Sequence, residues 1–98
     1  MNRKIYVLVR KDLSKSQQAV QGGHALAEYL LRGPATLWNN GTLVYLGVRN
    51  EGELKFWGRW LKDKGHQVVD FKEPDRNNEL TALATECSDT TVSKLRLL

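Results

Sequence analysis

Basic, acidic and amide side chains gather where an apolar run passes into a helical pattern. The run 5–10 ends in Arg10, and the link that follows contains Lys11, Asp12 and Lys15. In an open α/β sheet, ligands bind beyond the carboxyl ends of the strands, where free amides at a helix start attract negative charge. A phosphate or a developing oxyanion would be stabilised there. The same residues also fit a solvated turn organised by Asp12, so local spacing leaves both interpretations open.

A stripe of polar side chains continues along the helical pattern. At about 100° per residue, Gln17, Gln21, His24 and Glu28 fall on one narrow face. We expect a broader neighbouring face to pack on the core, made by Ala19, Val20, Gly23, Leu26, Ala27, Leu30 and Leu31. The polar stripe would then lie at the edge of the core. His24 could take part in acid or base catalysis if it reaches the strand ends, and it otherwise serves as a packing residue.

A second polar cluster follows the third predicted strand. It contains Glu73, Asp75, Asn77, Asn78 and Glu79. Turn-forming preferences explain several of these residues without any function. If the third strand runs parallel to the first, however, both clusters face one pocket, where Asp75 could orient water or hold a cationic partner.

Other catalytic arrangements do not fit the spacing. Ser14 and Ser16 lie two to three helical turns from His24, which excludes a Ser-His-Asp triad between them. The glycine pair 22–23 lies inside the helical pattern, where it favours close packing rather than a phosphate-binding loop. Cys87 is the only cysteine, so no intramolecular disulfide can form and no zinc-ligand spacing exists. We therefore expect no metal and no cofactor.

Strand and helix patterns alternate along the chain. Apolar runs predict strands over 5–10, 42–48, 66–72 and 80–87. The first helix begins near Ser14 with an S-x-x-Q capping pattern and ends at Gly33-Pro34, after which 34–38 could form a short helix. Asn50 and Glu53 repeat the capping signal for a second long helix. The segment 89–98 fits a short helix or an edge strand.

This succession predicts an α/β fold. A strand, helix, strand connection within one sheet makes its strands parallel and its crossover right-handed. We expect one three-layer domain over residues 1–98, with a mixed, mostly parallel four-stranded sheet, helices on both faces and the order βαβαββ. The length of 98 residues, 41% of them hydrophobic, suits a single core.

Charge and hydropathy set the expected surroundings of the protein. The net charge of +4 attracts polyanions, although many small proteins share such a surplus. The sequence contains no apolar run of about 20 residues and opens without a secretory leader. We expect a cytoplasmic protein without a membrane partner, either a monomer or a homodimer.

Two segments carry a family resemblance. The runs Val9-Arg10-Lys11-Asp12-Leu13 and Ala19-Val20-Gln21-Gly22-Gly23-His24-Ala25 resemble the opening of the type 2 peptidyl-tRNA hydrolases, whose pattern is V-R-x-D-L…G-K-x-x-A-Q-x-x-H-A. Trp38 before Gly41, and Asp75 after the third strand, continue the match in order. Enzymes of that family cleave the ester between a peptide and the terminal ribose of tRNA, without a metal, on a compact α/β fold. The resemblance implies that activity and a tRNA partner.

The chain departs from the family pattern at important positions. The family's functional lysine falls on Gln17, although Lys15 could reach the same space from the preceding turn. The D-x-G-x-T-Q segment of the family falls on 75–80 and keeps only Asp75. The segments 10–14 and 95–98 are also similar to the animal peptidyl-tRNA hydrolase domain-containing proteins, a branch that likewise departs from the lysine motif.

The resemblance implies a role for each site residue. Asp75 would orient the water or the ribose end, Gln17 or Lys15 would polarise the ester, and His24 and Gln21 would shape the pocket. The expected catalytic residues are Asp75, Gln17 and His24. The expected substrate-binding residues are Arg10, Lys11, Asp12, Lys15, Gln21, Asn77 and Asn78.

Two alternative functions remain open. A catalytically degenerate member of the same fold would bind tRNA or another acidic partner and do no chemistry. A small protein-interaction domain would instead use the aromatic side chains Phe56, Trp57 and Trp60.

Overall fold

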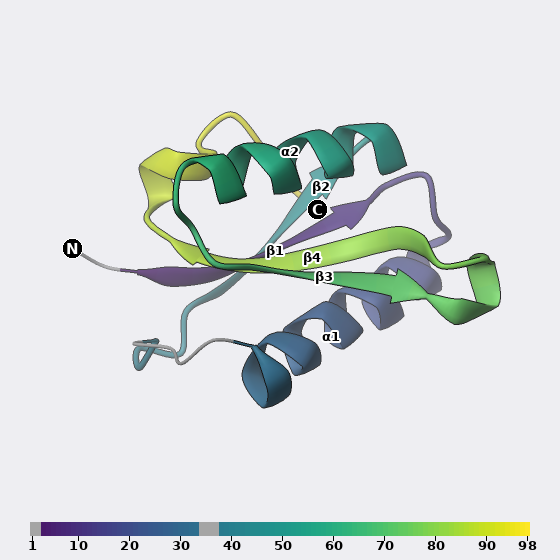
Figure 1. Ribbon diagram of the computed structural model, residues 1–98, viewed down its shortest axis with the longest axis horizontal. Helices are drawn as coiled ribbons and strands as arrows, with labels where there is room; N and C mark the ends of the chain where they lie inside the picture. Colours follow the sequence, from purple (N-terminus) through teal and green to yellow (C-terminus); the bar gives the residue numbers. More distant parts are fainter. Residues whose placement is uncertain (1–2, 34–37) are drawn as a thin grey trace.

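The computed structural model describes residues 3–33 and 38–98 (Figure 1). Its elements are β1 (Lys4–Arg10), α1 (Lys15–Arg32), β2 (Leu43–Val48), α2 (Glu51–Asp63), β3 (Val68–Glu73), the 3-10 helix η1 (Pro74–Arg76), β4 (Glu79–Cys87), the 3-10 helix η2 (Asp89–Val92) and β5 (Arg96–Leu97). The segment 89–98 thus contains both a short helix and a short strand. The short helix expected over 34–38 falls largely on residues 34–37, which lie outside the described part of the chain.

The strands form one five-stranded mixed sheet in the order β3-β4-β1-β2-β5. Only β1 and β2 pair in parallel, whereas β1–β4, β3–β4 and β2–β5 are antiparallel. The expected four-stranded, mostly parallel sheet of βαβαββ order is therefore wrong. The short connection 74–78 folds β3 and β4 into a hairpin, which must be antiparallel, and β4 inserts between β3 and β1. The fifth strand comes from the chain end, where β5 pairs with β2.

The strands β1, β2 and β3 still point in the same direction. β4 runs antiparallel to both of its neighbours, β1 and β3, so these two are parallel to each other without touching. Their carboxyl ends therefore lie at one end of the sheet. This end also receives the start of α1 and the β3–β4 connection (Figure 1).

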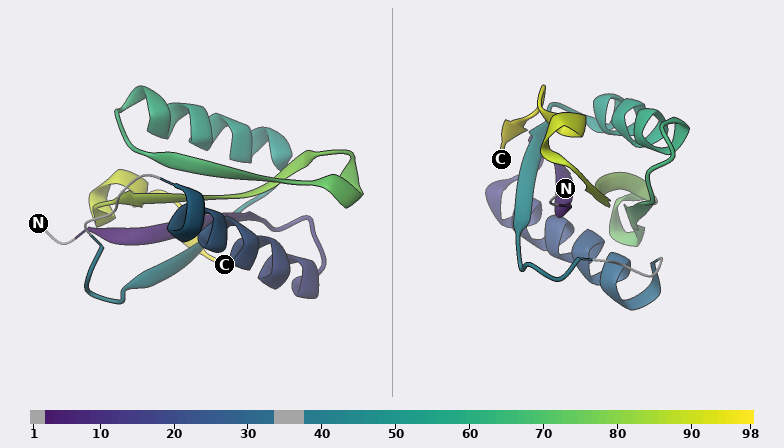
Figure 2. Two further views of the ribbon diagram at one scale, coloured as in Figure 1. Left: turned by 60° about the horizontal axis from the view of Figure 1, so that its bottom comes forward. Right: turned by 90° about the vertical axis from the view of Figure 1, so that its left-hand side faces the viewer.

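One helix covers each face of the sheet, as the end-on view in Figure 2 shows. Ile5, Val7 and Val9 of β1 face α1, whereas Tyr6 and Leu8 face α2. β1 is buried along nearly its whole length because it has neighbours on both edges and a helix on both faces. This central strand fixes the position of its last residue, Arg10.

The face that α1 buries differs from the expected one. The buried residues are Gln21, Gly22, Ala25 and Tyr29, while Val20, Leu30 and Leu31 are 47%, 48% and 80% exposed. A Cβ on Gly22 would lie 2.5 Å from Tyr45 Cε2, so the helix approaches the sheet most closely at this glycine. Close backbone approach at Gly22 rotates the helix so that Gln21, rather than the leucines, points inward.

Both long helices begin at the predicted capping residues. Ser14 Oγ accepts from the Gln17 amide at 3.2 Å, and Asn50 Oδ1 accepts from the Glu53 amide at 2.9 Å. These side chains replace partners that the first helical turn lacks. In the described residues, no helix is long and apolar enough to span a bilayer.

Candidate functional site

Arg10 joins the two polar clusters at the carboxyl end of β1. Its Nε and Nη2 donate to the two carboxylate oxygens of Asp12, both at 2.9 Å. Its Nη1 donates to Glu79 Oε1 at 2.8 Å and to the Leu80 carbonyl at 3.2 Å. The clusters lie far apart in the sequence, and this guanidinium brings them together.

The charge of Arg10 is compensated inside the fold. Its side chain is only 7% exposed, and the hydrogen bond with Asp12 raises the pKa of Arg10 while it lowers the pKa of Asp12. The hydrogen bond from Arg10 also lowers the pKa of Glu79. All three groups are therefore charged at neutral pH, and Arg10 and Asp12 hold the site together rather than present a free charge to a substrate.

A second set of contacts connects the start of α1 with the end of β3. The Gln21 side chain is completely buried, and its Nε2 donates to Glu73 Oε1 at 2.8 Å and to Gln17 Oε1 at 3.1 Å. Its Oε1 accepts from Thr81 Oγ1 at 2.7 Å. We call the four residues Gln17, Gln21, Glu73 and Thr81 the amide relay.

The carboxylate of Glu73 sets the direction of every hydrogen bond in the amide relay. An ionised carboxylate only accepts, so Gln21 must turn its NH₂ group toward Glu73 and its oxygen toward Thr81. The same NH₂ group then meets Gln17, which must present its own oxygen. Gln17 Nε2 is left facing away from Gln21, without a hydrogen-bond partner in the described residues. An oriented amide donor is thus exposed at the start of α1.

A β-bulge aims Thr81 into the amide relay. Phe71 pairs with Ala82 and Lys72 pairs with Leu80, which leaves Thr81 as the extra residue of β4. Without the bulge, strand alternation would turn Thr81 to the α2 face, opposite to Ala82. The bulge turns it toward α1 instead, where it meets Gln21.

The backbone at the start of α1 adds further donors. Ser14 Oγ accepts from the Gln17 amide, and the Ser14 carbonyl oxygen accepts from the Gln18 amide. The amides of Lys15 and Ser16 have no partner within the described residues. These two N–H groups carry the partial positive charge of the helix N-terminus, close in the chain to Gln17.

His24 lies beside the amide relay in a stacking contact. It is one helical turn beyond Gln21, and its ring stacks on Phe71 with centroids 4.5 Å apart and planes 7° apart. Its side chain is exposed and makes no hydrogen bond in the described residues. His24 therefore covers β3, and the structure gives it no acid or base partner.

The β3–β4 connection carries Asp75 and two turn residues. Asp75 lies in η1, is exposed, and has no ion-pair or hydrogen-bond partner among the described residues. Asn77 and Asn78 adopt left-handed backbone conformations with φ of 56° and 60°, and the Asn78 amide donates to the Glu73 carbonyl. Asparagine tolerates this conformation well, so both residues have a turn-forming role.

The two predicted lysines lie differently with respect to the amide relay. Lys11 passes over Gly47 of β2, where a Cβ would come within 2.6 Å of Lys11 Cδ. It lines a small cleft with Lys94 and Arg96 on the β2–β5 side, away from β3. Lys15 is the first residue of α1 and is exposed. Of the two, Lys15 is the one close in the chain to Gln17.

Three residues of this region were not among the predicted site residues: Glu73, Glu79 and Thr81. Glu73 and Glu79 belong to the second polar cluster, but the sequence pattern predicted no role for either of them. Thr81 lay within an apolar strand pattern, and no local signal marks a β-bulge there. The carboxylate and hydroxyl partners of Gln21 depend on the rotation of α1, which the sequence pattern did not predict.

An aromatic groove lies between α2 and the segment 90–94. It has a volume of about 320 Å³ and is lined by Phe56, Trp57 and Trp60 with Thr90, Thr91, Ser93 and Lys94. Phe56 is 61% exposed, whereas Trp57 and Trp60 are half-buried against the core. In residues 3–33 and 38–98, no group of His, Cys, Asp and Glu side chains could hold a metal ion.

Comparison with known proteins shows the fold alone. No protein-family model and no curated protein matches this chain. Among solved structures, a protein of unknown function from Agrobacterium tumefaciens strain C58 is similar, with a TM-score of 0.72 over 100% of this chain and 98% of that chain. The two sequences are 13% identical, so the similarity extends to the architecture and not to an activity.

Proposed function

We propose that this protein hydrolyses the ester between a peptide and the terminal ribose of tRNA. The observation that carries the proposal is the amide relay, in which a buried glutamine orients a carboxylate and an amide donor at one end of the sheet. Ester hydrolysis needs both groups, one to accept a proton from water and one to stabilise the developing oxyanion. The resemblance of 9–13 and 19–25 to the type 2 peptidyl-tRNA hydrolases supports the same substrate.

Each step of the proposed reaction uses a group at this end of the sheet. Gln17 Nε2, with the free amides of Lys15 and Ser16, donates to the ester carbonyl oxygen. The Glu73 carboxylate takes a proton from a water molecule as that water attacks the carbonyl carbon. The tetrahedral intermediate then breaks its bond to the ribose oxygen, which receives the proton from Glu73. The peptide leaves as a carboxylic acid, which loses the second proton of the water to solvent and becomes a carboxylate. The other product is deacylated tRNA, and Asp75 binds the ribose hydroxyl beside the leaving oxygen.

The test is turnover of an N-acetylated aminoacyl-tRNA by the purified protein. We expect Glu73→Gln to lower kcat by about 10²- to 10⁴-fold, because it removes the general base. We expect Gln17→Ala to lower kcat by about 10²-fold, through loss of an oxyanion donor. Glu28→Gln is the matched control for the change of glutamate to glutamine. Glu28 lies on α1, the helix that carries Gln17, and forms a surface ion pair with Arg32. If Glu73→Gln retains wild-type turnover, the mechanism is wrong.

One observation favours a second candidate, which is tRNA binding without chemistry. Arg10 is compensated by Asp12 and Glu79, Arg76 also pairs with Glu79, and Gln17 stands where the family resemblance places a lysine. The donor that the amide relay presents at Gln17 is therefore neutral. The variant Gln17→Lys separates the two candidates: turnover that appears only in this variant identifies the parent protein as a non-hydrolytic binder.

A further inference from the structure

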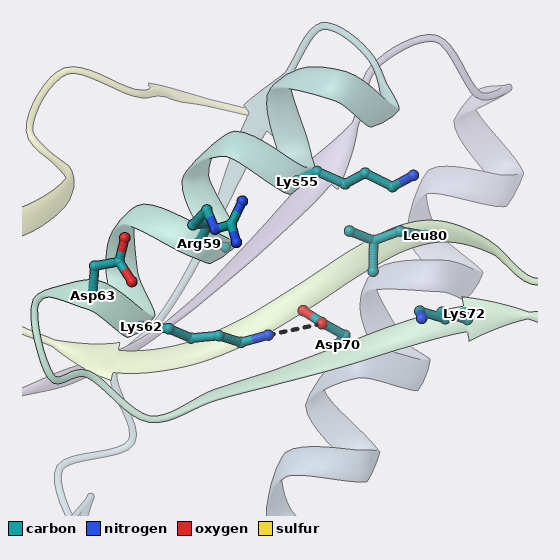
Figure 3. A pocket seen from close by; sticks show the side chains of 8 residues that line it. Lys55, Arg59, Lys62, Asp63, Asp70, Lys72 and Leu80 are labelled. Carbon is teal, nitrogen blue, oxygen red and sulfur yellow. Dashed lines mark hydrogen bonds and ion pairs between the residues drawn. The ribbon is translucent and has the colours of Figure 1, made fainter.

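A cationic cleft lies on the opposite face of the sheet from α1, between α2 and β3. It has a volume of about 400 Å³, and Figure 3 shows its lining. Basic side chains project from both walls, and the Leu80 side chain of β4 lies between them. The lining residues are Lys55, Gly58, Arg59, Lys62, Asp63, Asp70, Lys72 and Leu80.

Two of the four cations in the cleft are uncompensated. Lys62 Nζ lies 3.1 Å from Asp70 Oδ2, and Lys55 Nζ lies 3.7 Å from Glu51 Oε2. Arg59 and Lys72 have no ion-pair partner in the described residues. They face the cleft from α2 and from β3 respectively (Figure 3). A negatively charged group in the cleft would therefore meet free positive charge on both walls.

The cations of α2 form a row rather than a point. Lys55, Arg59 and Lys62 are separated by four and three residues, which places them on one flank of the helix. At 1.5 Å per residue, the row extends over about 10 Å. A row of cations suits a ligand with several phosphates in succession, whereas a single small anion would use one or two of them.

The cleft and the amide relay use neighbouring residues of β3 on opposite faces of the sheet. Lys72 directly precedes Glu73 in β3, and strand alternation sends the two side chains to opposite faces of the sheet. β3 is the edge strand, so no further strand separates the two faces at this border. A flexible polyanion can therefore pass from the amide relay over the edge of β3 and into the cleft.

We propose that this cleft binds the sugar–phosphate backbone of single-stranded RNA, in continuity with the end that reaches the amide relay. This inference rests on the proposed function for the identity of the ligand. The cleft contains no aromatic side chain, so contact is with the phosphates and not by stacking of bases. The expected binding is weakly dependent on sequence and strongly dependent on salt.

Asp70 allows a second test, in which RNA affinity should rise instead of fall. Its Oδ2 accepts a hydrogen bond from the Lys62 ammonium, and its Oδ1 is buried without a hydrogen-bond partner in the described residues. Asp70 thus withdraws one cation from the ligand and adds a negative charge beside it. Replacing Asp70 by asparagine should free Lys62 for a phosphate.

The experiment measures binding of a fluorescently labelled, unacylated single-stranded RNA at several salt concentrations. A plot of the log of the association constant against log salt has a negative slope, and in Arg59→Gln/Lys72→Gln this slope should be less steep by about 1.4. Each lost phosphate contact contributes about 0.7. The affinity should fall by about tenfold at low salt, and in Asp70→Asn it should rise by about threefold. Both altered cations are exposed and unpaired, and an unchanged melting temperature verifies the fold.

The β5 edge of the sheet supplies the matched control for the cations, and α1 supplies the control for Asp70. Lys94→Gln/Arg96→Gln removes the same charge from two exposed residues at the far edge of the sheet from β3, and Glu28→Gln matches Asp70→Asn. Equal effects in the cleft and control variants would overturn the proposal, because they would reflect net charge alone. Equally tight binding of anionic lipid vesicles through Arg59 and Lys72 would also overturn it.

RNA binding is measured without an ester, so it can fail or succeed independently of hydrolysis. Cleft-dependent binding without turnover supports this inference and refutes the proposed hydrolysis. Turnover that persists in Arg59→Gln/Lys72→Gln, at substrate concentrations below KM and with unchanged RNA affinity, refutes the cleft and leaves the hydrolysis in place.

Discussion

Replacing Gln21 by methionine should destabilise the protein by about 2–3 kcal/mol. Gln21 is fully buried and makes three side-chain hydrogen bonds. Loss of the donor to the Glu73 carboxylate costs about 1.5–3 kcal/mol, and loss of the acceptor for Thr81 costs about 1 kcal/mol. The bond to Gln17 is at the surface and adds little. Methionine has nearly the volume of glutamine, so no large cavity opens, and burial of its apolar chain offsets part of the loss.

Urea denaturation measures this effect as the free energy of unfolding. For a domain of this size, the expected loss lowers Tm by about 10 °C. Gln17→Met serves as the matched control, because Gln17 is exposed and its loss should cost less than about 0.5 kcal/mol. An equal loss in both variants would show that the amide relay adds no stability beyond the change of residue type.

A double-mutant cycle isolates the hydrogen bond between Gln21 and Thr81. Thr81→Val keeps the side-chain shape and removes the hydroxyl, which leaves the Gln21 oxygen buried without its partner. In Gln21→Met/Thr81→Val both polar groups are absent, so the double variant should be about 1 kcal/mol more stable than the sum of the single losses predicts. Strict additivity would show that the two side chains are not coupled and would refute the hydrogen bond between Thr81 and Gln21.

Two further predictions concern packing and pH. Gly22→Ala should cost about 1 kcal/mol, because the new methyl group would meet the Tyr45 ring, whereas Gly23→Ala should stabilise by up to about 1 kcal/mol, since its Cβ meets no atom within 4 Å; thermal denaturation compares the two, and equal effects would contradict the close approach at Gly22. Burial, together with Glu86, raises the pKa of Tyr29 to about 12, above the value of about 10 in an unfolded chain. The resulting stability is present below pH 10 and is lost as the pH rises through 12, so Tyr29→Phe should unfold less steeply than the wild type over that range in alkaline titration by circular dichroism.

Local signals in the sequence predicted the elements well. The capping residues Ser14 and Asn50 marked the helix starts because an N-cap depends on a side chain and a backbone amide three residues away. Strand segments were also visible as apolar runs. The order of the strands in the sheet could not be predicted in this way, because the position of β4 between β3 and β1 depends on contacts between residues far apart in the chain.

The sequence predicted part of the candidate site as well, namely the residue types that form it, but not their partners. Residue types alone placed polar clusters after β1 and β3 and singled out the stripe that contains Gln17 and Gln21. They did not show that Arg10 is compensated, that Lys11 turns toward β2, or that Glu73 belongs beside Gln21. Each of these depends on which partner a charged or amide group meets after folding.

The sequence by itself determined where helices and strands begin, and which segments carry ionisable or amide side chains, since both depend on neighbours within a few residues. Only the tertiary structure decided the rotation of α1 at Gly22 and the turn of Thr81 at the β-bulge. Both result from close packing of helix on sheet, in which steric contact and the need to satisfy buried polar groups outweigh the hydrophobic periodicity of the helix.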